Sequence, residues 1–275
     1  MKLSIITVNY NNKEGLKKTV NSVLSQTYHD FEWIIIDGGS TDGSKEIIEQ
    51  IKDNLAFWCS EPDKGIYNAM NKGIAKSKGD FVNFMNSGDC YFEKDTLEKV
   101  FMEGVDADII YGDWVKYSKG KEFVVKSPNV ADLDFFFRHT ICHQAQFIKT
   151  ENLKNNGYDE SFKIYADWVF CVQLLLKGAT TQYVEIPICV YDLSGVSSHL
   201  NDDMWIENTR RHGVFPENTH KLLSEKAILK ARINEIEQVP LFCDLQQLVF
   251  THRLFYFSIK VYFELLKLIK KVFGF

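Results

Sequence analysis

Residues 35–44 read Ile35-Ile36-Asp37-Gly38-Gly39-Ser40-Thr41-Asp42-Gly43-Ser44 and join an apolar run, Phe31–Ile36, to the helical pattern of Gly43–Ile51. A short apolar run rich in β-branched residues is typical of a buried strand, and Asp-Gly-Gly stops such a strand. Thr41 or Asp42 is placed to cap the helix that follows. The stretch therefore predicts a strand, a tight polar turn and a helix in direct succession.

Strand-like and helix-like segments alternate on both sides of this stretch. Further strands are predicted at Leu3–Val8 and Phe81–Met85, and apolar residues recur at helical spacing in Glu14–Gln26 and Gly65–Lys78. Alternation of strands and helices with short links is the pattern of an α/β protein with a parallel sheet covered on both faces. We therefore expect a mostly parallel central sheet flanked by helices.

Polar clusters follow three of the predicted strands, at residues 7–11, 37–44 and 86–89. In open parallel sheets, ligands bind beyond the carboxyl ends of the strands. The three clusters therefore outline a binding site at one edge of the sheet.

The regular pattern ends near Gly112. Strands and helices then mix less regularly, and Cys142–Lys149 is predicted to be a further strand. From Asp202 onward the chain is expected to be helical, apart from Pro216 and Pro240.

Composition excludes several classes of protein. The chain has 275 residues, of which 45% are hydrophobic and 25% charged, so it can bury a sizeable core and is not disordered. A net charge of -5 argues against binding nucleic acid, which depends on clustered Lys and Arg. None of the 6 cysteines lies in a Cys-x-x-Cys pair. No apolar stretch approaches the roughly 20 residues of a membrane span, and the N-terminus lacks a signal-peptide cleavage site. We expect a cytoplasmic protein with reduced thiols.

The first two polar clusters allow two interpretations each. Thr7, Asn9 and Tyr10 can contact a base or ribose, or they can form a capped turn into the next helix. Asp37 can accept a hydrogen bond from a uracil N–H and Gly38 allows close backbone approach, but a tight turn before a helix uses the same residue types.

The later clusters are equally ambiguous when each is taken alone. Residues 63–71 could reach a ribose or diphosphate, or they could be an ordinary helix start. Asn86-Ser87-Gly88-Asp89 could hold Mg²⁺ or Mn²⁺ through its carboxylate, or it could be a turn. Asp167 could be a general base or an N-cap. His143 and His199 are lone histidines, which are more often structural or on the surface.

Taken together and in order, these segments resemble the glycosyltransferase family 2 pattern of the GT-A fold. The segments that carry the resemblance are residues 4–11 (Ser-Ile-Ile-Thr-Val-Asn-Tyr-Asn), 22–28 (Ser-Val-Leu-Ser-Gln-Thr-Tyr), 35–44 as quoted above, 63–75 (Asp-Lys-Gly-Ile-Tyr-Asn-Ala-Met-Asn-Lys-Gly-Ile-Ala), Gly79-Asp80 and Asn86-Ser87-Gly88-Asp89. The match is dense to about Gly112 and continues more loosely through His143-Gln144, Gly157-Tyr158-Asp159-Glu160 and Asp167 to about Ser198.

The resemblance implies a three-part organisation and an activity. Residues 1–112 would be the nucleotide-sugar-binding half of a GT-A domain, 113–200 its acceptor-binding half, and 201–275 a helical C-terminal extension. The implied reaction is the inverting transfer of a sugar from a nucleotide diphosphate, by resemblance UDP, to a hydroxyl of a saccharide or lipid-linked saccharide. The expected cofactor is Mg²⁺ or Mn²⁺.

The resemblance also implies roles for individual residues. Asp89 matches the metal-binding acid, Asp167 matches the general base, and Gly195-Val196-Ser197 looks like the loop that closes over the diphosphate. The expected donor-binding residues are Thr7, Asn9, Tyr10, Asp37, Gly38, Ser40, Asp63, Lys64, Asn68, Asn71, Asn86, Ser87 and Gly88. The residues expected to contact the acceptor or the diphosphate are His143, Trp168, Ser197 and His199.

Two departures from the family pattern affect these expectations. Where the family often has paired acids, this chain has Asp37-Gly38, so base recognition would rest on fewer carboxylates. The metal motif keeps one acid, Asp89, where other members have two or three. Either the metal would bind more weakly, or the diphosphate and water would supply most of its ligands.

Residues 253–275 combine apolar residues with charges on one helical face, at Lys260, Glu264, Lys267 and Lys271. This pattern is typical of an interfacial helix, which would place the protein at the inner face of the cell membrane beside a lipid-linked acceptor of surface-polysaccharide assembly. A helix buried against the body of the protein or in a homodimer is the alternative.

Two other functions compete with glycosyl transfer. The thinned acidic motif would also suit a catalytically idle nucleotide-sugar-binding protein. A sugar-phosphate nucleotidyltransferase would share a similar sheet, but it would want a Gly-rich basic loop after the first strand. The chain has Asn9-Tyr10-Asn11-Asn12 there instead.

Overall fold

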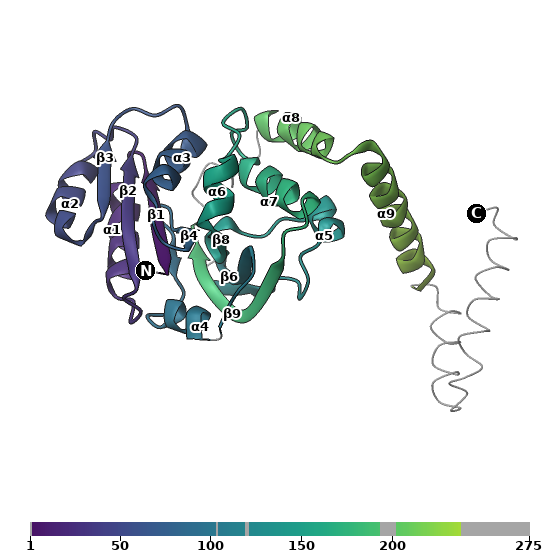
Figure 1. Ribbon diagram of the computed structural model, residues 1–275, viewed down its shortest axis with the longest axis horizontal. Coiled ribbons are helices and arrows are strands. Elements are labelled where there is room, and N and C mark those ends of the chain that lie inside the picture. The colour runs from purple at the N-terminus through teal and green to yellow at the C-terminus, as the bar shows by residue number, and fades with distance from the viewer. Residues whose placement is uncertain (1, 103, 119–120, 193–201, 238–275) are drawn as a thin grey trace, which may run out of the picture. The chain divides into compact units, whose positions relative to one another are not determined.

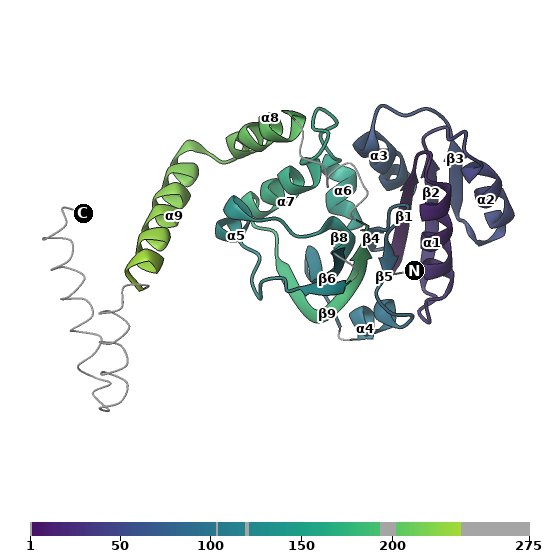
Figure 2. The ribbon, with the colours of Figure 1, turned by 180° about the vertical axis from the view of Figure 1, so that it is seen from behind.

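The structure is a computed structural model that describes residues 2–102, 104–118, 121–192 and 202–237. The chain forms two compact units, Met1–Phe215 and Pro216–Phe275. The first unit is built around one curled sheet of nine strands, with helices on both sides of it (Figures 1 and 2). The predicted α/β architecture is confirmed.

The first part of this unit alternates strands and helices. Its elements are β1 (Leu3–Asn9), α1 (Lys13–Leu24), β2 (Phe31–Asp37), α2 (Ser44–Gln50), a 3-10 turn (Lys52–Asn54), β3 (Phe57–Ser60), α3 (Ile66–Lys76) and β4 (Phe81–Phe84). The strands lie in the order β3-β2-β1-β4, and all three pairings are parallel. Every residue of β1 is buried, because helices cover both faces of the sheet, and this is why the strand reads as a continuous apolar run.

The capping predicted for α2 is wrong in detail. Gly43 occupies the N-cap position with a positive φ of 92° and offers no side-chain cap. Asp42 instead accepts a hydrogen bond from the backbone N of Ser44, at 3.0 Å, and from that of Lys13, at 2.8 Å. The carboxylate therefore ties the start of α2 to the start of α1.

The second part of the unit is mixed. Its elements are β5 (Cys90–Tyr91), α4 (Thr96–Met102), β6 (Ile109–Ser118), β7 (Lys121–Val125), α5 (Leu133–Arg138), a 3-10 turn (His143–Ala145), β8 (Gln146–Lys149), α6 (Thr150–Asn156), α7 (Ala166–Leu176), β9 (Thr181–Tyr191), α8 (Asp202–Arg211) and a 3-10 turn (His212–Val214). The sheet continues β4-β8-β6-β9-β5, with β7 beside β6, and only β6 and β9 pair in parallel.

A bulge explains how β9 contains a proline. The β6–β9 register shifts between Tyr111 and Asp113, where Asp113 lies opposite Pro187. Gly112 sits so close to β9 that a Cβ there would lie 2.7 Å from the carbonyl oxygen of Ile186. A proline is tolerated at such an irregularity, because the ladder is already interrupted.

The strand predicted at Cys142–Lys149 begins only at Gln146. Residues His143–Ala145 form the 3-10 turn instead, closed by a hydrogen bond of 2.9 Å from Ala145 N to the carbonyl oxygen of Cys142. This turn, named η2 below, aims two polar side chains at the site.

The two faces of the sheet are packed differently. The large hydrophobic cluster on one face contains Leu3 and Ile5 of β1 together with residues of α1, α2 and α4. Ile6 points to the other face, where a Cβ on Gly73 of α3 would lie 2.6 Å from Ile6 Cγ2. The glycine thus allows α3 to lie directly on β1.

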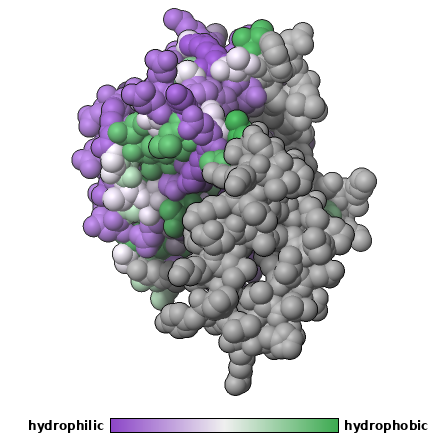
Figure 3. Space-filling model, turned by 90° about the vertical axis from the view of Figure 1, so that its right-hand side faces the viewer, coloured by the Kyte–Doolittle hydropathy of each residue, from purple (hydrophilic) through white to green (hydrophobic). Residues whose placement is uncertain are grey.

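The described part of the second unit is α9 (Glu217–Glu237). Leu222, Ile228 and Leu229 are more than half exposed on it. Among the described residues, no helix is both long and apolar enough to cross a membrane. Figure 3 shows one face of the molecule, on which the described surface is mostly hydrophilic with a limited hydrophobic patch. Residues 253–275, expected to form an interfacial helix, lie outside the described residues.

Candidate active site

The ends of β1 and β2 meet through Asp37, which is completely buried. Its Oδ1 accepts hydrogen bonds from Asn9 Nδ2 (2.7 Å) and Ser40 Oγ (2.6 Å). Its Oδ2 accepts from the backbone N of Ser40 (2.9 Å) and from Ser60 Oγ (2.6 Å). Burial on its own would raise the pKa of Asp37, but the bonds from Ser40, Ser60 and Asn9 outweigh it and lower the pKa. Asp37 is thus an ionised anchor with both oxygens engaged.

Gly38, next to this anchor, lies between two other side chains of the predicted donor set. A Cβ built on Gly38 would lie 2.7 Å from Asp63 Oδ2 and 3.1 Å from Tyr10 Cδ2. Asp63 Oδ1 accepts a hydrogen bond of 2.9 Å from the backbone N of Gly65. The Tyr10 side chain is 67% exposed. The missing side chain at Gly38 therefore gives room to the Asp63 carboxylate beside an exposed aromatic ring.

Three other members of the predicted donor set face protein groups. Thr7 is completely buried, and its Oγ1 accepts a hydrogen bond of 3.0 Å from Trp33 Nε1. Asn68 and Asn71 both donate to the Glu160 carboxylate, at 2.9 and 3.0 Å. These two amides thus tie α3 to the loop that precedes α7, a contact that the sequence analysis missed. Lys64, also of the predicted set, is exposed.

The ends of β1 and β4 leave three polar atoms buried without a hydrogen-bond partner. They are Asn9 Oδ1, Asn86 Oδ1 and Ser87 Oγ. Buried polar groups in proteins are nearly always hydrogen-bonded, so unpaired ones close together need an explanation. Their position beyond the carboxyl ends of parallel strands is where such sheets bind ligands.

Asp89 follows in the same loop and is almost fully buried. Its Oδ2 accepts from Gln144 Nε2 at 2.6 Å, and its Oδ1 accepts from the backbone N of Asp192 at 2.8 Å. Burial raises the pKa of Asp89 to about 6, despite the opposing effect of these two bonds. A second carboxylate lies close by, because a Cβ on Gly88 would be 2.7 Å from Asp192 Oδ2.

These residues fit a divalent cation held by few protein ligands. The described residues contain no cluster of three or more His, Cys, Asp or Glu side chains that could hold a metal alone. Asp89 is nonetheless a buried carboxylate whose pKa burial raises to about 6, and the Asp192 carboxylate lies close to the same loop. Hard cations such as Mg²⁺ often combine one or two carboxylates with substrate phosphates and water.

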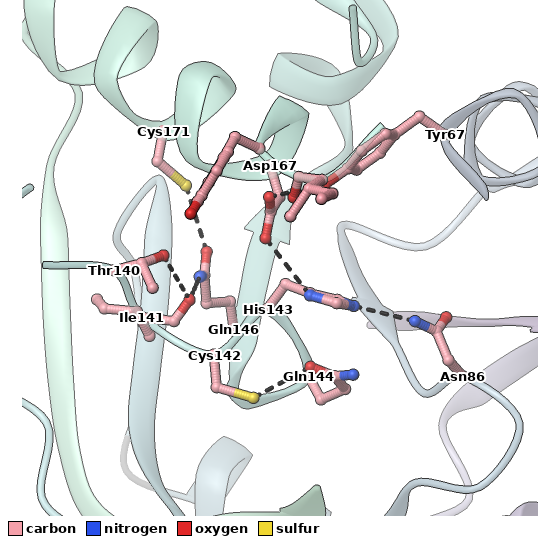
Figure 4. Close-up of polar contacts among 12 residues, drawn as sticks. Tyr67, Asn86, Thr140, Ile141, Cys142, His143, Gln144, Gln146, Asp167 and Cys171 are labelled. Carbon is pink, nitrogen blue, oxygen red and sulfur yellow. Dashed lines mark hydrogen bonds and ion pairs between the residues drawn. The ribbon is translucent and has the colours of Figure 1, made fainter. Parts of the chain in front are cut away.

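Asp167 lies in the first turn of α7, and Tyr165, not Asp167, holds the N-cap position. The interpretation of Asp167 as a helix cap is therefore wrong. Its Oδ1 accepts from Tyr67 Oη at 2.9 Å, and its Oδ2 lies 3.4 Å from His143 Nδ1. His143 Nε2 in turn lies 3.0 Å from Asn86 Nδ2 (Figure 4). One chain of polar contacts therefore links α3, α7, η2 and the loop after β4.

The charges along this chain favour an ionised Asp167. Its side chain is only 16% exposed. Burial would raise the pKa of Asp167, but the interactions with His143 and Tyr67 lower it overall. For His143, burial would lower the pKa, and the interaction with Asp167 raises it overall. The pair can therefore hold a carboxylate in the interior and exchange a proton with a bound hydroxyl.

The remaining residues expected to contact the acceptor or the diphosphate divide into two groups. Trp168 is buried, and its Nε1 donates to the carbonyl oxygens of Phe136 (2.9 Å) and His139 (3.0 Å). Ser197 and His199 lie outside the described residues.

The sequence analysis also missed residues that support the site. They are Gln144, which holds Asp89, Tyr67, which holds Asp167, and Glu207 of α8. Only Gln144 carried a signal, because it directly follows the histidine that had been singled out.

Comparison with known proteins connects this geometry to a family. The family model described as "Glycosyl transferase family 2" matches residues 4–176. An uncharacterized glycosyltransferase of Mycobacterium tuberculosis is 33% identical over 221 residues, which is 77% of this chain and 82% of the relative. A PGL/p-HBAD biosynthesis glycosyltransferase of Mycobacterium bovis is 30% identical over 214 residues, covering 74% of this chain and 82% of the relative.

Solved structures of low sequence identity share the fold. TarS of S. aureus (residues 1–349, in complex with UDP-GlcNAc) has a TM-score of 0.65 at 19% identity and covers 81% of this chain and 70% of its own. The mannosyltransferase PcManGT from Pyrobaculum calidifontis, in complex with GDP-Man and Mn²⁺, has a TM-score of 0.56 at 13% identity, covering 90% of this chain and 83% of its own. The fold is that of GT-A glycosyltransferases.

Proposed function

The chain belongs to glycosyl transferase family 2, and on this premise we propose that it moves a sugar from a nucleotide diphosphate, with inversion, to a hydroxyl of a saccharide or lipid-linked saccharide. The observation that carries the proposal is the buried Asp167 carboxylate, held by Tyr67 and His143 and linked through His143 to Asn86. The same contacts join a base to the loop of Asp89.

The donor base would lie on Tyr10. The exposed ring offers a stacking face, and Asp63 Oδ2, beside Gly38, can accept a hydrogen bond from an imide N–H such as that of uracil. Asp37 would act indirectly by shaping the loop, because its oxygens already accept four hydrogen bonds. UDP is the donor nucleotide that this arrangement and the UDP-GlcNAc complex of TarS favour.

Asp89 would hold a divalent cation, Mg²⁺ or Mn²⁺, together with the donor diphosphate, and Asp192 is the nearest further carboxylate. Such an ion stabilises the negative charge that develops on a leaving nucleoside diphosphate. Gln144 donates to Asp89 Oδ2 and so fixes the orientation of the carboxylate. The Mn²⁺ in the PcManGT complex agrees with this proposal.

Asp167 would take the proton of the acceptor hydroxyl as that oxygen attacks the anomeric carbon. The bond to the diphosphate oxygen breaks in the same displacement, so no sugar–enzyme bond forms and the configuration inverts. A positioned general base contributes about 10²–10⁴-fold to a rate. Tyr67 and His143 hold the carboxylate in one orientation and keep it ionised.

The acceptor would be a surface saccharide or its lipid-linked precursor, on the cytoplasmic side of the membrane. The relative named for PGL/p-HBAD biosynthesis supports a glycolipid or related acceptor. Residues 253–275 would provide peripheral membrane contact or, as the alternative, a homodimer contact.

A panel of nucleotide sugars with and without Mn²⁺, followed by thermal unfolding, tests the donor, and a transfer assay tests the reaction. A ligand that binds only the folded chain at 100 times its Kd stabilises it by about 2.7 kcal/mol. We expect stabilisation by one nucleotide class. Asp167→Asn should keep the donor affinity within about twofold and lower the transfer rate by about 10²–10⁴-fold.

Asp106→Asn is the matched control, because its carboxylate is 88% exposed on the surface. This variant should transfer at the wild-type rate. Full activity of Asp167→Asn would remove Asp167 from the role of base. Stabilisation without transfer or hydrolysis of any nucleotide sugar would favour the catalytically idle binding protein instead.

A further inference from the structure

Arg211, the last residue of α8, is buried in an unusual way. Its exposed fraction is only 9%. The guanidinium carbon lies 4.4 Å from the centroid of the Tyr165 ring and 4.5 Å from that of the Trp168 ring. Two cation–π contacts therefore hold the guanidinium.

The N–H groups of this guanidinium have no partner in the part of the chain that the structure describes. Nε is buried without a hydrogen bond, and no ion pair or side-chain hydrogen bond involves Arg211. Cation–π contacts offset part of the cost of burying a charge, but they do not supply the hydrogen bond that the buried Nε–H lacks. A buried cation in this state is ready to receive an anion.

The carboxylates that could have paired with Arg211 are already used. Glu207 lies one helical turn earlier on α8, and its carboxylate accepts from the backbone N of Lys163 (2.6 Å), Ile164 (2.9 Å) and Tyr165 (3.4 Å). Asp167 is held by Tyr67 and His143. The carboxylates of Glu207 and Asp167 thus interact with other groups and do not pair with the guanidinium of Arg211.

The neighbouring arginine shows the usual alternative. Arg210 is about half exposed, donates to the carbonyl oxygen and hydroxyl of Ser161 at 3.2 and 2.6 Å, and lies 4.0 Å from Asp159 Oδ2. The two adjacent arginines of α8 therefore differ in whether protein groups accept hydrogen bonds from the guanidinium.

The position of Arg211 relates it to the acceptor. Tyr165, the N-cap of α7, and Trp168, in its first turn, flank Asp167 in the sequence, and both rings contact Arg211. Burial lowers the pKa of the Arg211 guanidinium, and the negative charge of Asp167 opposes this effect. If Asp167 is the base of the proposed function, the molecule that lies beside it is the acceptor. The planar fork of an arginine matches two oxygens of a phosphate group.

We propose that Arg211, in contact with the rings of Tyr165 and Trp168, forms a subsite for a phosphate group carried by the acceptor. This inference rests on the proposed function, because Asp167 defines the acceptor side of the site. The subsite would select acceptors with a phosphate near the reacting hydroxyl over neutral saccharides.

Calorimetric titration of the full chain with methyl phosphate tests the subsite. The ionic strength is kept constant with chloride, and the titration is done with and without saturating UDP and Mn²⁺, so that phosphate binding at the donor site is recognised. We expect Arg211→Gln to weaken methyl phosphate binding by about tenfold or more, as loss of a charge-assisted pair does. Arg210→Gln removes the same charge and should change the affinity by less than about twofold.

The affinity for UDP shows whether Arg211 binds a phosphate of the acceptor or the diphosphate of the donor. We expect this affinity to be equal in the wild type and both variants. If UDP affinity falls in Arg211→Gln as much as methyl phosphate affinity, Arg211 serves the donor diphosphate and the acceptor subsite is overturned. Equal losses in the Arg210 and Arg211 variants, or unchanged methyl phosphate binding in Arg211→Gln, also overturn it.

Two further measurements test the inference even if Arg211→Gln fails to fold. Arg211→Lys keeps the charge but not the planar fork, and we expect an intermediate loss of affinity. A wild-type chain that binds methyl phosphate no better than acetate overturns the inference without any variant. Failure of the proposed function shows separately, as absence of nucleotide binding by the wild-type chain.

Discussion

At the scale of the residue, Asp37 is a predicted binding residue whose two oxygens both accept hydrogen bonds from protein groups. The sequence suggested a contact between this carboxylate and a uracil N–H. The structure surrounds it with donors from Asn9, Ser40 and Ser60. The acid with a free oxygen beside Gly38 is Asp63, 26 residues further along the chain by number, which no local pattern could pair with it.

Asp37→Asn should destabilise the fold by about 1–3 kcal/mol at neutral pH. An amide can replace only one carboxylate oxygen, so in either orientation its NH₂ meets an N–H donor, from Asn9 or from the backbone of Ser40. Because the folded state lowers the pKa of Asp37, its stabilisation is present above the ordinary value of 3.8 and is lost as the pH falls below it.

Urea unfolding of both proteins between about pH 3 and pH 7 measures this effect, and the difference in stability should shrink toward the acid end. Asp53→Asn is the control, because Asp53 is exposed in the 3-10 turn after α2. A difference that stays constant over the whole range would show that the charge of Asp37 is not what stabilises the loop.

At the scale of the element, short segments position the reacting groups. In η2, His143 contacts Asp167 and the next residue, Gln144, donates to Asp89. One turn therefore contacts both Asp167, the proposed base, and Asp89, the proposed metal-binding acid. A strand was predicted over these residues. The turn forms instead because a hydrogen bond from Ala145 N to the carbonyl oxygen of Cys142 closes it, and the strand therefore starts only at Gln146.

α8 positions the start of α7 in a similar way, through Glu207 and the three backbone N–H groups of residues 163–165. Glu207→Ala should lower the free energy of unfolding by about 1–3 kcal/mol, because three partly buried backbone donors lose a charged acceptor. It should also lower the transfer rate, since Asp167 follows this loop, while donor affinity remains close to that of the wild type.

Glu207→Gln should recover part of both losses, because the amide oxygen still accepts. Glu151→Ala, at an exposed position in α6, should change stability by less than about 0.5 kcal/mol. Equal effects on donor affinity and transfer rate in Glu207→Ala would mean that α8 supports the whole unit and not the base in particular. Chemical denaturation, calorimetry and the transfer assay supply the three measurements.

At the scale of the whole molecule, the strand pairing in the first half of the sheet could be predicted from sequence, whereas the order and direction of the strands in the second half could not. Strands β1, β2 and β4 are buried runs separated by helices, so the periodicity alone indicates parallel pairing. The antiparallel pairing of β4 with β8 places Phe81 opposite Lys149, far along the sequence. Which strand pairs with β4 depends on tertiary packing, which a local sequence pattern does not predict.

The candidate site divides in the same way. Residues at strand ends, such as Asn9, Asp37 and Asp89, could be named from the sequence because topology brings those ends together. The contacts of Gln144 with Asp89 and of Glu160 with α3 could not be predicted, because both residues approach from the second half of the unit. Asn68 and Asn71, which were expected to bind the donor, both donate hydrogen bonds to Glu160, and their contact with a ligand stays a prediction.

The C-terminal segment carries the last prediction. If residues 253–275 lie on a membrane surface, the full chain should bind vesicles containing phosphatidylglycerol, and a chain ending at Pro240 should not. Each lysine near an anionic surface contributes about 1 kcal/mol, so replacing Lys260, Lys267 and Lys271 by glutamine should weaken binding about 100-fold. Replacing Lys221, Lys226 and Lys230 of α9 removes the same charge and should have a much smaller effect.

Sedimentation with the vesicles measures the binding of all four proteins. If the two triple variants bind alike, the contact depends on net charge and not on this segment. If the shortened chain sediments like the full one, membrane contact through residues 253–275 is excluded. The alternative, a homodimer contact through these residues, is then tested by measuring the molecular mass in solution.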